Sequence, residues 1–387
     1  MSLPPASQTT GFLSFNSRPP TICLTAPTPH PPEALLASWK AEGFNVNYMP
    51  YSPLEHDTYI KALKNLHNNL ALGEQYAIIC YGEAASVVLR TATKPMAHCC
   101  AIAAFYPTVL PSPKHKYPSL LRVVVHVAGN QVSPPPEECE WKCYRYETCD
   151  MGFADPTGEE YMNVEANLAW SRTLSVVRKG FKMDVDLEPL VSEAWKGKYE
   201  IDDPEHGALK TMQMFSQASP HVTILPTLEG GIGRRHLQEF YTEFFIPSLV
   251  EDFDMRLVSR TVGVDRVVDE MVVSFTHTDE VDWILPGVPP TDRYVEIPMV
   301  SIVGVRGGKL VSEHMYWDQA SVLVQVGLLD PKAVPRNLKN HGLKRLPVSG
   351  VEAAKQLVEP NQERYNKLLK EHGLMDVLNG VNGVNGS

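Results

Sequence analysis

The chain has 387 residues, of which 43% are apolar and 21% charged, and its formal net charge is −10 at pH 7. This length allows two domains of ordinary size with the composition of a globular protein. The negative charge argues against nucleic acid or an anionic membrane as partner, and no apolar run is long enough to cross a bilayer. The N-terminus lacks the pattern of a secretory signal, so we expect a cytoplasmic protein whose seven scattered cysteines are reduced thiols without a metal.

Short apolar runs alternate with amphipathic segments through the first half of the chain. Residues 1–19, rich in proline and serine, are expected to be a poorly ordered lead-in. Strands are expected at 21–26, 45–51, 76–81, 100–107 and 121–129. Helices are expected at 32–42, 56–72, 83–93 and 161–179, with a proline-rich loop that ends at residue 138. Strands separated by helices predict a parallel sheet, so residues 20–180 are expected to form an α/β domain.

The second half changes from helices to strands. Residues 181–215 are charged without a clear repeat and are expected to form a linker or a covering helix. A helix is expected at 232–251, followed by strands at 255–263, 267–278, 295–305 and 309–319. Helices before an antiparallel meander predict an α+β domain at 216–330. Residues 331–387 are expected to be a helical tail with a loose, low-complexity end.

The strand, turn and helix at residues 76–89 stand where an α/β-hydrolase carries its nucleophile. There a serine or cysteine sits on a strained turn that exposes it at the edge of the sheet. The corresponding position in this chain is Gly82, which has no side chain, and Cys80 lies two residues earlier on the strand.

Residues 71–181 resemble the dienelactone hydrolase family. The motifs that carry the resemblance are YGEAA, AAFYP and MGFADPTGEEYMNVEANLAWSRTL. The resemblance implies an α/β-hydrolase-like parallel sheet and a catalytic triad. The triad positions are replaced here by Gly82, by Asn130 or Gln131, and by Met151. Losing even one triad member removes most covalent catalysis, so a catalytically degenerate scaffold is expected.

A hydrolase with a non-standard nucleophile is the alternative for this domain. Thiolates are intrinsically good nucleophiles, so Cys80 could act with His98 or His126 on an ester or lactone. The spacing of these residues places no base beside Cys80.

The strand at 309–319 is unusually rich in proton-transfer groups, because strands generally disfavour Asp and Glu. With period-two alternation, His314, Tyr316 and Asp318 share one face, whereas Glu313 and Trp317 share the other. The first face is expected to line a proton-transfer pocket. Glu313 is expected to be solvated or to lie at a dimer interface.

Residues 221–329 resemble the SnoaL-like polyketide cyclase family of the nuclear-transport-factor-2-like superfamily. The motifs that carry the resemblance are GGIGRRHLQEFY, SRTVGVDRVVDEMVVSFTH, LPGVPPTDRYVEIP and GKLVSEHMYWD. The resemblance implies a curved antiparallel sheet that forms a cone-shaped pocket with its helices. It also implies an Asp and a His that exchange protons with an enolisable polyketide, without metal or cofactor.

The predicted catalytic residues are Asp318 and His314, with His277 expected to follow Val273 and Phe275 into the pocket. Two alternatives stay open, a helix cap for Asp318 and a structural role for His314. The residues expected to bind substrate are Tyr316, Trp283, Trp317 and Tyr241.

These features predict a small-molecule enzyme of secondary metabolism. The expected reaction is acid–base cyclisation, isomerisation or dehydration of a polyketide-like substrate. The alternatives are the hydrolase described above and a non-catalytic protein for ligand binding or dimerisation. Apolar residues on both faces of the later strands favour a homodimer or packing on the first domain.

Overall fold

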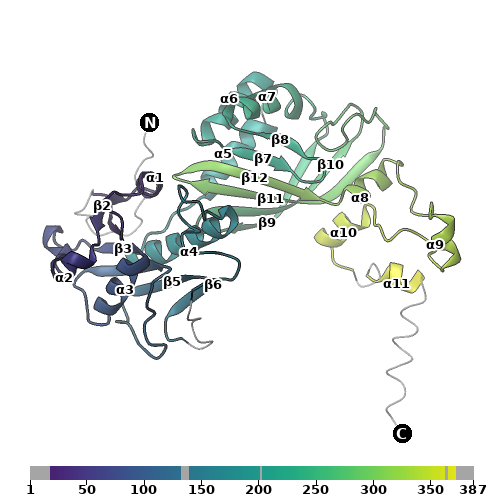
Figure 1. The fold of residues 1–387 in the computed structure, drawn as a ribbon. Helices are drawn as coiled ribbons and strands as arrows, with labels where there is room; N and C mark the ends of the chain where they lie inside the picture. Colours follow the sequence, from purple (N-terminus) through teal and green to yellow (C-terminus); the bar gives the residue numbers. More distant parts are fainter. Residues whose placement is uncertain (1–17, 132–138, 201–202, 362–364, 372–387) are drawn as a thin grey trace, which may run out of the picture. The chain divides into compact units, whose positions relative to one another are not determined.

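The structure is a computed structural model that describes residues 18–131, 139–200, 203–361 and 365–371 (Figure 1). Most of the expected lead-in, the end of the proline-rich loop and the expected loose C-terminus lie outside the described residues. The chain divides into two compact units. Unit 1 comprises residues 1–186 with 306–308, and unit 2 comprises residues 187–305 with 309–387.

Unit 1 contains a six-stranded sheet in the order β2-β1-β3-β4-β5-β6, in which every neighbouring pair is parallel. The strands are β1 (Thr21–Ala26), β2 (Asn45–Pro50), β3 (Tyr76–Tyr81), β4 (Cys99–Phe105), β5 (Arg122–Ala128) and β6 (Lys142–Tyr146). The parallel sheet expected from the sequence is therefore confirmed. The assignment to the dienelactone hydrolase family stays a prediction.

The helices of unit 1 pack on this sheet and on one another. They are α1 (Glu33–Ala41), η1 (Pro53–Glu55), α2 (His56–Lys64), η2 (Leu66–Asn69), α3 (Gly82–Thr91) and α4 (Asn163–Phe181). Helix α3 packs on β1, β3 and β4, and α4 packs on β3, β4 and β5. All six residues of β3 are consequently buried, as expected for a parallel strand with both faces covered. The helix expected at 56–72 ends at Lys64 and continues only as the 3₁₀ turn η2.

Unit 2 contains a mixed six-stranded sheet in the order β8-β7-β12-β11-β10-β9. The strands are β7 (His221–Ile224), β8 (Glu229–Ile232), β9 (Asp254–Val262), β10 (Arg266–Thr276), β11 (Tyr294–Arg306) and β12 (Lys309–Trp317). Strands β9, β10 and β11 are antiparallel neighbours, as the sequence predicted. Strand β12 pairs in parallel with β7, which the sequence did not predict.

One face of this sheet forms the interior of unit 2. Alternate residues of β10 and β11 are buried, in the period-two pattern of a sheet with one covered face. A β-bulge interrupts the pairing of β10 with β9 at Glu270 and Met271, and Pro298 of β11 lies opposite Val272. A bulge bends its strand and a proline removes a ladder hydrogen bond, so both features curve the sheet at the same level.

The helices of unit 2 are α5 (Glu188–Tyr199), α6 (Pro204–Met214), α7 (Arg234–Glu239), η3 (Phe240–Phe245), α8 (Gln319–Gln325), α9 (Arg336–Asn340), α10 (Glu352–Val358) and α11 (Lys367–Glu371). The segment expected as a linker or covering helix contains the packed pair α5 and α6. Figure 1 shows α6 and α7 on one side of the sheet. The helix expected at 232–251 is α7, which passes directly into the π-helix η3. Within the described ranges, no helix combines the length and the apolar composition needed to cross a membrane.

Candidate functional site

Asp318 lies at the end of β12 and is the N-cap of helix α8. Its Oδ1 accepts a hydrogen bond from the backbone N–H of Ala320 at 3.0 Å, and its side chain is exposed. Tyr316, on the same face of β12, is 41% exposed. The expectation that this face lines a pocket is therefore wrong, and the helix-cap alternative describes the position of Asp318.

His314 is half-buried and pairs with another histidine. Its Nε2 lies 3.3 Å from Nε2 of His221, which is on the neighbouring strand β7. Burial and the nearby His221 both lower the pKa of His314 below its usual value. His314 therefore belongs to a histidine pair, and among the described residues Asp318 makes its side-chain hydrogen bond to helix α8 instead.

Glu313 lies on the opposite face of β12 and is completely buried, at 0% exposed. The expectation of a solvated Glu313 is therefore wrong. Its Oε2 forms an ion pair with Nζ of Lys198 on α5 and accepts a hydrogen bond from the hydroxyl of Tyr241 at 3.4 Å. Its Oε1 accepts a hydrogen bond from the hydroxyl of Ser301 on β11 at 3.4 Å. We call Glu313, Lys198, Tyr241 and Ser301 the interior charge cluster.

The elements of unit 2 explain how the interior charge cluster is assembled. Lys198 stands in the last turn of α5, where the helix dipole favours a cation. Tyr241 stands in the π-helix η3, and π-helical turns occur frequently at functional sites. Glu313 and Ser301 come from the covered face of the sheet. A buried charge is tolerated only when it is paired and hydrogen-bonded, and all four side chains are at most 1% exposed.

Two tyrosines close to Glu313 remain protonated at neutral pH. Burial, and secondly the charge of Glu313, raise the pKa of Tyr241 well above its usual value, and the same causes act on Tyr199. The ammonium of Lys198 lies 5.5 Å from the centre of the Tyr241 ring. Tyr241 was expected to be part of the substrate-binding wall, and the structure places it as a hydrogen-bond donor beside a carboxylate.

A second buried ion pair joins β9, β10 and α5. Asp269 is 0% exposed and accepts two hydrogen bonds from the guanidinium of Arg260, at 2.6 and 3.0 Å. The same guanidinium contacts Glu188 at 3.2 Å and Ser192 at 3.0 Å, both in α5. This bidentate pair fixes α5 on the sheet, so we assign it a structural role.

His277 continues the buried side of β10 beyond Phe275, and both side chains are 0% exposed. Its Nδ1 lies 3.0 Å from the hydroxyl of Thr291, whereas its buried Nε2 has no hydrogen-bond partner among the described residues. Burial lowers the pKa of His277, and the charge of Asp292 partly opposes this shift. His277 is therefore an interior imidazole whose Nε2 forms no hydrogen bond with the described residues.

The expected aromatic wall exists in part. Trp283 is 1% exposed and its ring centre lies 4.9 Å from that of Phe245 and 5.7 Å from that of Trp317. The indole N–H of Trp283 is buried and, within the described chain, has no acceptor. Tyr316 is on the other side of the sheet and does not belong to this group.

The positions of the predicted triad in unit 1 carry no catalytic group. Gly82 adopts a φ of 57°, so the strained turn between β3 and α3 is present without a nucleophile. Asn130 and Met151 are exposed. The side chain of Gln131 accepts from the N–H of Ala128 at 2.8 Å and donates to the carbonyl of Pro107 at 2.7 Å, so both ends of its amide are bound to backbone groups.

The alternative nucleophile of unit 1 has no base beside it. Cys80 is 0% exposed, its thiol donates to the carbonyl of Ala103, and burial raises the pKa of this thiol well above its usual value. His126 uses both ring nitrogens, which lie 2.9 Å from the hydroxyls of Tyr146 and Thr173, and burial lowers its pKa to about 3. His98 is exposed. Within the parts of the chain that the structure describes, no group of three or more His, Cys, Asp or Glu side chains could hold a metal ion.

Comparison with known proteins finds solved structures that are similar to a part of the chain. No protein-family model matches the chain, and no curated protein matches it. A protein from Jannaschia sp. CCS1 assigned to the SnoaL-like polyketide cyclases is 14% identical, over 37% of this chain and 94% of that chain, with a TM-score of 0.31. A protein of ketosteroid isomerase-like fold from Catenulispora acidiphila is 18% identical, over 38% of this chain and 97% of that chain, with a TM-score of 0.28. An NTF2-like protein from Burkholderia pseudomallei is 10% identical, over 37% of this chain and 98% of that chain, with a TM-score of 0.29. SnoaL-like and NTF2-like proteins are thus the structural neighbours of a part of this chain.

Proposed function

We propose that unit 2 is an acid–base catalyst for a small, mostly apolar carbonyl compound with an enolisable position. The observation that carries the proposal is the interior charge cluster, which places a carboxylate, an ammonium and a protonated phenol together inside an apolar layer. Proton transfer needs a base and a hydrogen-bond donor for the developing oxyanion, and both are present.

The proposed reaction begins when the carboxylate of Glu313 takes a proton from the carbon next to the substrate carbonyl. The electron pair of that C–H bond forms the C=C bond of an enolate, whose oxygen accepts a hydrogen bond from Tyr241. The ammonium of Lys198 stabilises the negative charge on that oxygen. In a β,γ-unsaturated substrate the enolate is a dienolate, and return of the proton from Glu313 to its γ-carbon gives isomerisation. Attack of the enolate carbon on a second carbonyl gives cyclisation, after which the new alkoxide takes the proton from Glu313. In a β-hydroxy carbonyl compound the enolate expels the β-hydroxyl, which leaves as water with the proton from Glu313, and this gives dehydration.

This proposal revises the catalytic residues expected from the sequence. Glu313 replaces Asp318 as the carboxylate, and His277 is retained as a second proton carrier because its Nε2 has no partner among the described residues. A lowered pKa keeps the His277 imidazole neutral near pH 7, so that it can accept a proton. Because the interior charge cluster is closed, substrate entry requires α5 or η3 to move away from the sheet.

Deuterium incorporation tests the proposal without knowledge of the natural substrate. The protein is incubated with a panel of cyclic and linear 1,3-diketones and β-keto esters in D₂O, and exchange at the activated carbon is followed by NMR. We expect exchange above the buffer rate, reduced about 100-fold or more in Glu313→Gln and reduced also in Tyr241→Phe. Asp318→Asn is the matched control. It removes an exposed carboxylate that directly follows the same strand, β12, and that caps helix α8.

The stability of each variant is measured alongside exchange, so that a loss of fold is not taken for a loss of chemistry. Ser301→Ala offers a milder change at the same carboxylate. If folded wild-type protein exchanges no substrate faster than folded Glu313→Gln, the acid–base proposal is refuted.

A non-catalytic binding protein is the second candidate function. The observation that favours it is that both carboxylate oxygens of Glu313 have partners and the cluster is closed to solvent. Under this alternative the same compounds raise the melting temperature of the protein, but they undergo no exchange above the buffer rate.

A further inference from the structure

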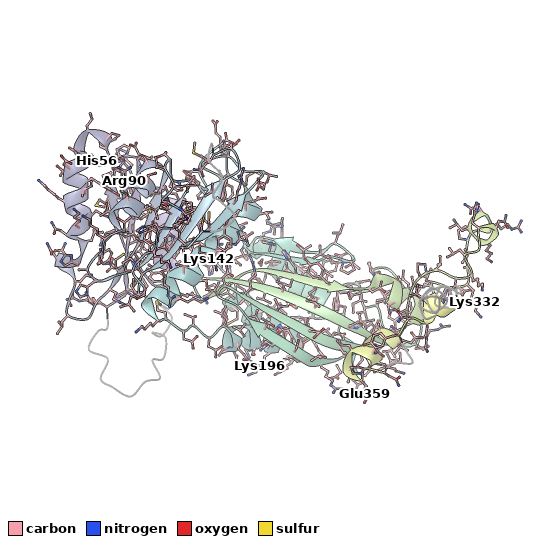
Figure 2. The ribbon with its side chains drawn as sticks, turned by 90° about the horizontal axis from the view of Figure 1, so that it is seen from below. His56, Arg90, Lys142, Lys196, Lys332 and Glu359 are labelled. Carbon is pink, nitrogen blue, oxygen red and sulfur yellow. The ribbon has the colours of Figure 1, made fainter. Side chains whose placement is uncertain are left out.

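A pocket of about 850 Å³ in unit 1 collects basic side chains. It lies at the first residues of β5 and β6 and along the second half of α4. Its basic lining residues are Lys116, Arg122, Lys142, Arg172 and Lys179. Among the described residues, Glu140 is the only acidic one in its lining. Lys142, labelled in Figure 2, is the first residue of β6.

Within the described residues, most of these cations have no acidic partner. Lys116 pairs with Glu140 at 3.4 Å, and both side chains are largely exposed. For the other four, the described part of the chain contains no carboxylate within 4.0 Å. Like charges around one concavity repel one another, and this occurs in a chain whose net charge is −10. The arrangement raises the free energy of the empty protein and favours a bound anion.

Arg172 is already held in a fixed orientation. Its guanidinium lies over the ring of Tyr144, 3.8 Å from the ring centre, and its Nη1 donates to the hydroxyl of Tyr146 at 3.1 Å. Nζ of Lys142 lies 5.2 Å from the centre of the same Tyr144 ring. A stacked guanidinium has fewer conformations to lose on binding and keeps N–H donors for a phosphate or carboxylate.

We propose that this pocket binds a small phosphate ester that carries a flat ring, which is the chemistry of a nucleotide. Arg172 and Lys142 contact the phosphates, and the remaining cations balance further negative charge. The apolar lining residues are Tyr117, which is half-buried, and Leu121 and Trp141, which are buried, so the surface offered to the ring is mainly that of Tyr117. Its volume falls within the range of small-molecule sites, and its concave form suits a small ligand better than a nucleic-acid backbone.

The pocket is separate from the predicted triad positions of unit 1. It lies at the amino-terminal ends of β5 and β6, whereas Gly82 follows the carboxyl end of β3 and Asn130 follows that of β5. Ligand sites of parallel sheets generally occur at the carboxyl ends of the strands. The proposed nucleotide site is therefore an additional site, and it does not depend on the function proposed for unit 2.

Isothermal titration of the full chain with ATP, AMP and inorganic phosphate tests the proposal at about 50 and about 200 mM salt, concentrations over which phosphate contacts weaken measurably. We expect ATP to bind more tightly than AMP, and both more tightly than phosphate, with affinity that falls as salt rises. Arg172→Gln removes a charge-assisted hydrogen bond and is expected to weaken ATP binding about ten- to hundredfold. Arg90→Gln is the matched control, because Arg90 is an exposed arginine of unit 1 that does not line this pocket.

A second variant keeps the test decisive if Arg172→Gln disturbs Tyr146. Lys142→Gln changes an exposed side chain and is also expected to weaken ATP binding, about tenfold. The proposal is overturned if none of the three compounds binds, or if ATP binds folded Lys142→Gln and wild type equally. If inorganic phosphate binds as tightly as ATP, the pocket does not recognise a ring, and that part of the proposal is refuted.

Discussion

Replacement of Lys198 by methionine tests the energetic role of the interior charge cluster. Methionine has a similar length without the charge, so the variant leaves the buried carboxylate of Glu313 without its cation. Removing one partner of a buried ion pair costs about 3–5 kcal/mol of the free energy of unfolding. The hydroxyls of Tyr241 and Ser301 stay within 3.4 Å of the carboxylate, so we expect a loss near the lower end, about 3 kcal/mol.

The double variant Lys198→Met/Glu313→Leu removes both charges and so tests whether the ion pair itself stabilises the fold. With both charges gone, desolvation no longer opposes folding, and we expect stability within about 1 kcal/mol of wild type or above it. Arg235→Gln is the control, because it breaks the exposed pair Arg235–Glu239, whose side chains are 86% and 48% exposed. An exposed helical pair of this kind contributes about 0.5 kcal/mol or less.

Urea unfolding measured by tryptophan fluorescence gives these free energies. Each unit holds three of the six tryptophans, so fluorescence reports on both units. Hydrogen exchange of peptides from β12 therefore assigns the change to unit 2. If Lys198→Met lowers the free energy of unfolding by less than about 1 kcal/mol, the reasoning is contradicted. A fully buried carboxylate that has lost its cation should destabilise the fold by more than that.

Three further predictions concern single residues. Burial lowers the pKa of His126 to about 3 in the folded protein, whereas its pKa in the unfolded chain is near 6.5. As pH falls, the unfolded state therefore binds this proton first. The free energy of unfolding therefore decreases from pH 6.5 towards pH 3, by at most about 1.4 kcal/mol per pH unit, and His126→Asn should reduce this slope in urea unfolding series. Gly82→Ala should cost about 1–2 kcal/mol in the same measurement, because φ is 57° there, although a Cβ would have only an ordinary 3.5 Å contact with Pro27. Asp318→Ala should lose about 1 kcal/mol with the cap of α8 while leaving deuterium exchange unchanged; reduced exchange in the folded variant would return Asp318 to the catalytic residues.

The sequence predicted the longer elements because their periodicity reflects burial. Five of the six strands of unit 1 and the four long strands of unit 2 lie at the expected places. Strand β6, KCYRY, was not predicted because its polar composition lacks an apolar run, and a strand at the edge of a sheet needs none. Strands β7 and β8 have four residues each, and β8 contains two glycines, so local propensity argued against them. Strand β7 is stabilised by pairing with the distant strand β12, and β8 by pairing with β7.

The candidate site could be predicted only in part, because alternation shows which residues share a face but not which face is covered. Glu313 shares its face with Met315 and Trp317, and this more apolar face was the available signal that it points inward. Its partner Lys198 is 115 positions away in the sequence and stands in a helix with no clear amphipathic repeat. A long-range ion pair of this kind leaves no local pattern.

Some unusual features of this fold are explained by stability alone, and others are not. A glycine at positive φ is the least costly way to join β3 to α3, so the turn at Gly82 persists without any nucleophile and is no sign of hydrolase activity. The Lys198–Glu313 pair and the basic side chains that line the pocket of unit 1 have the opposite character, because replacing a buried ion pair or a cluster of like charges by apolar or neutral residues often leaves stability unchanged or raises it. Folding alone does not account for their presence. If the double variant of the ion pair proves as stable as wild type but inactive in exchange, retention of the pair must be attributed to chemistry rather than to the fold.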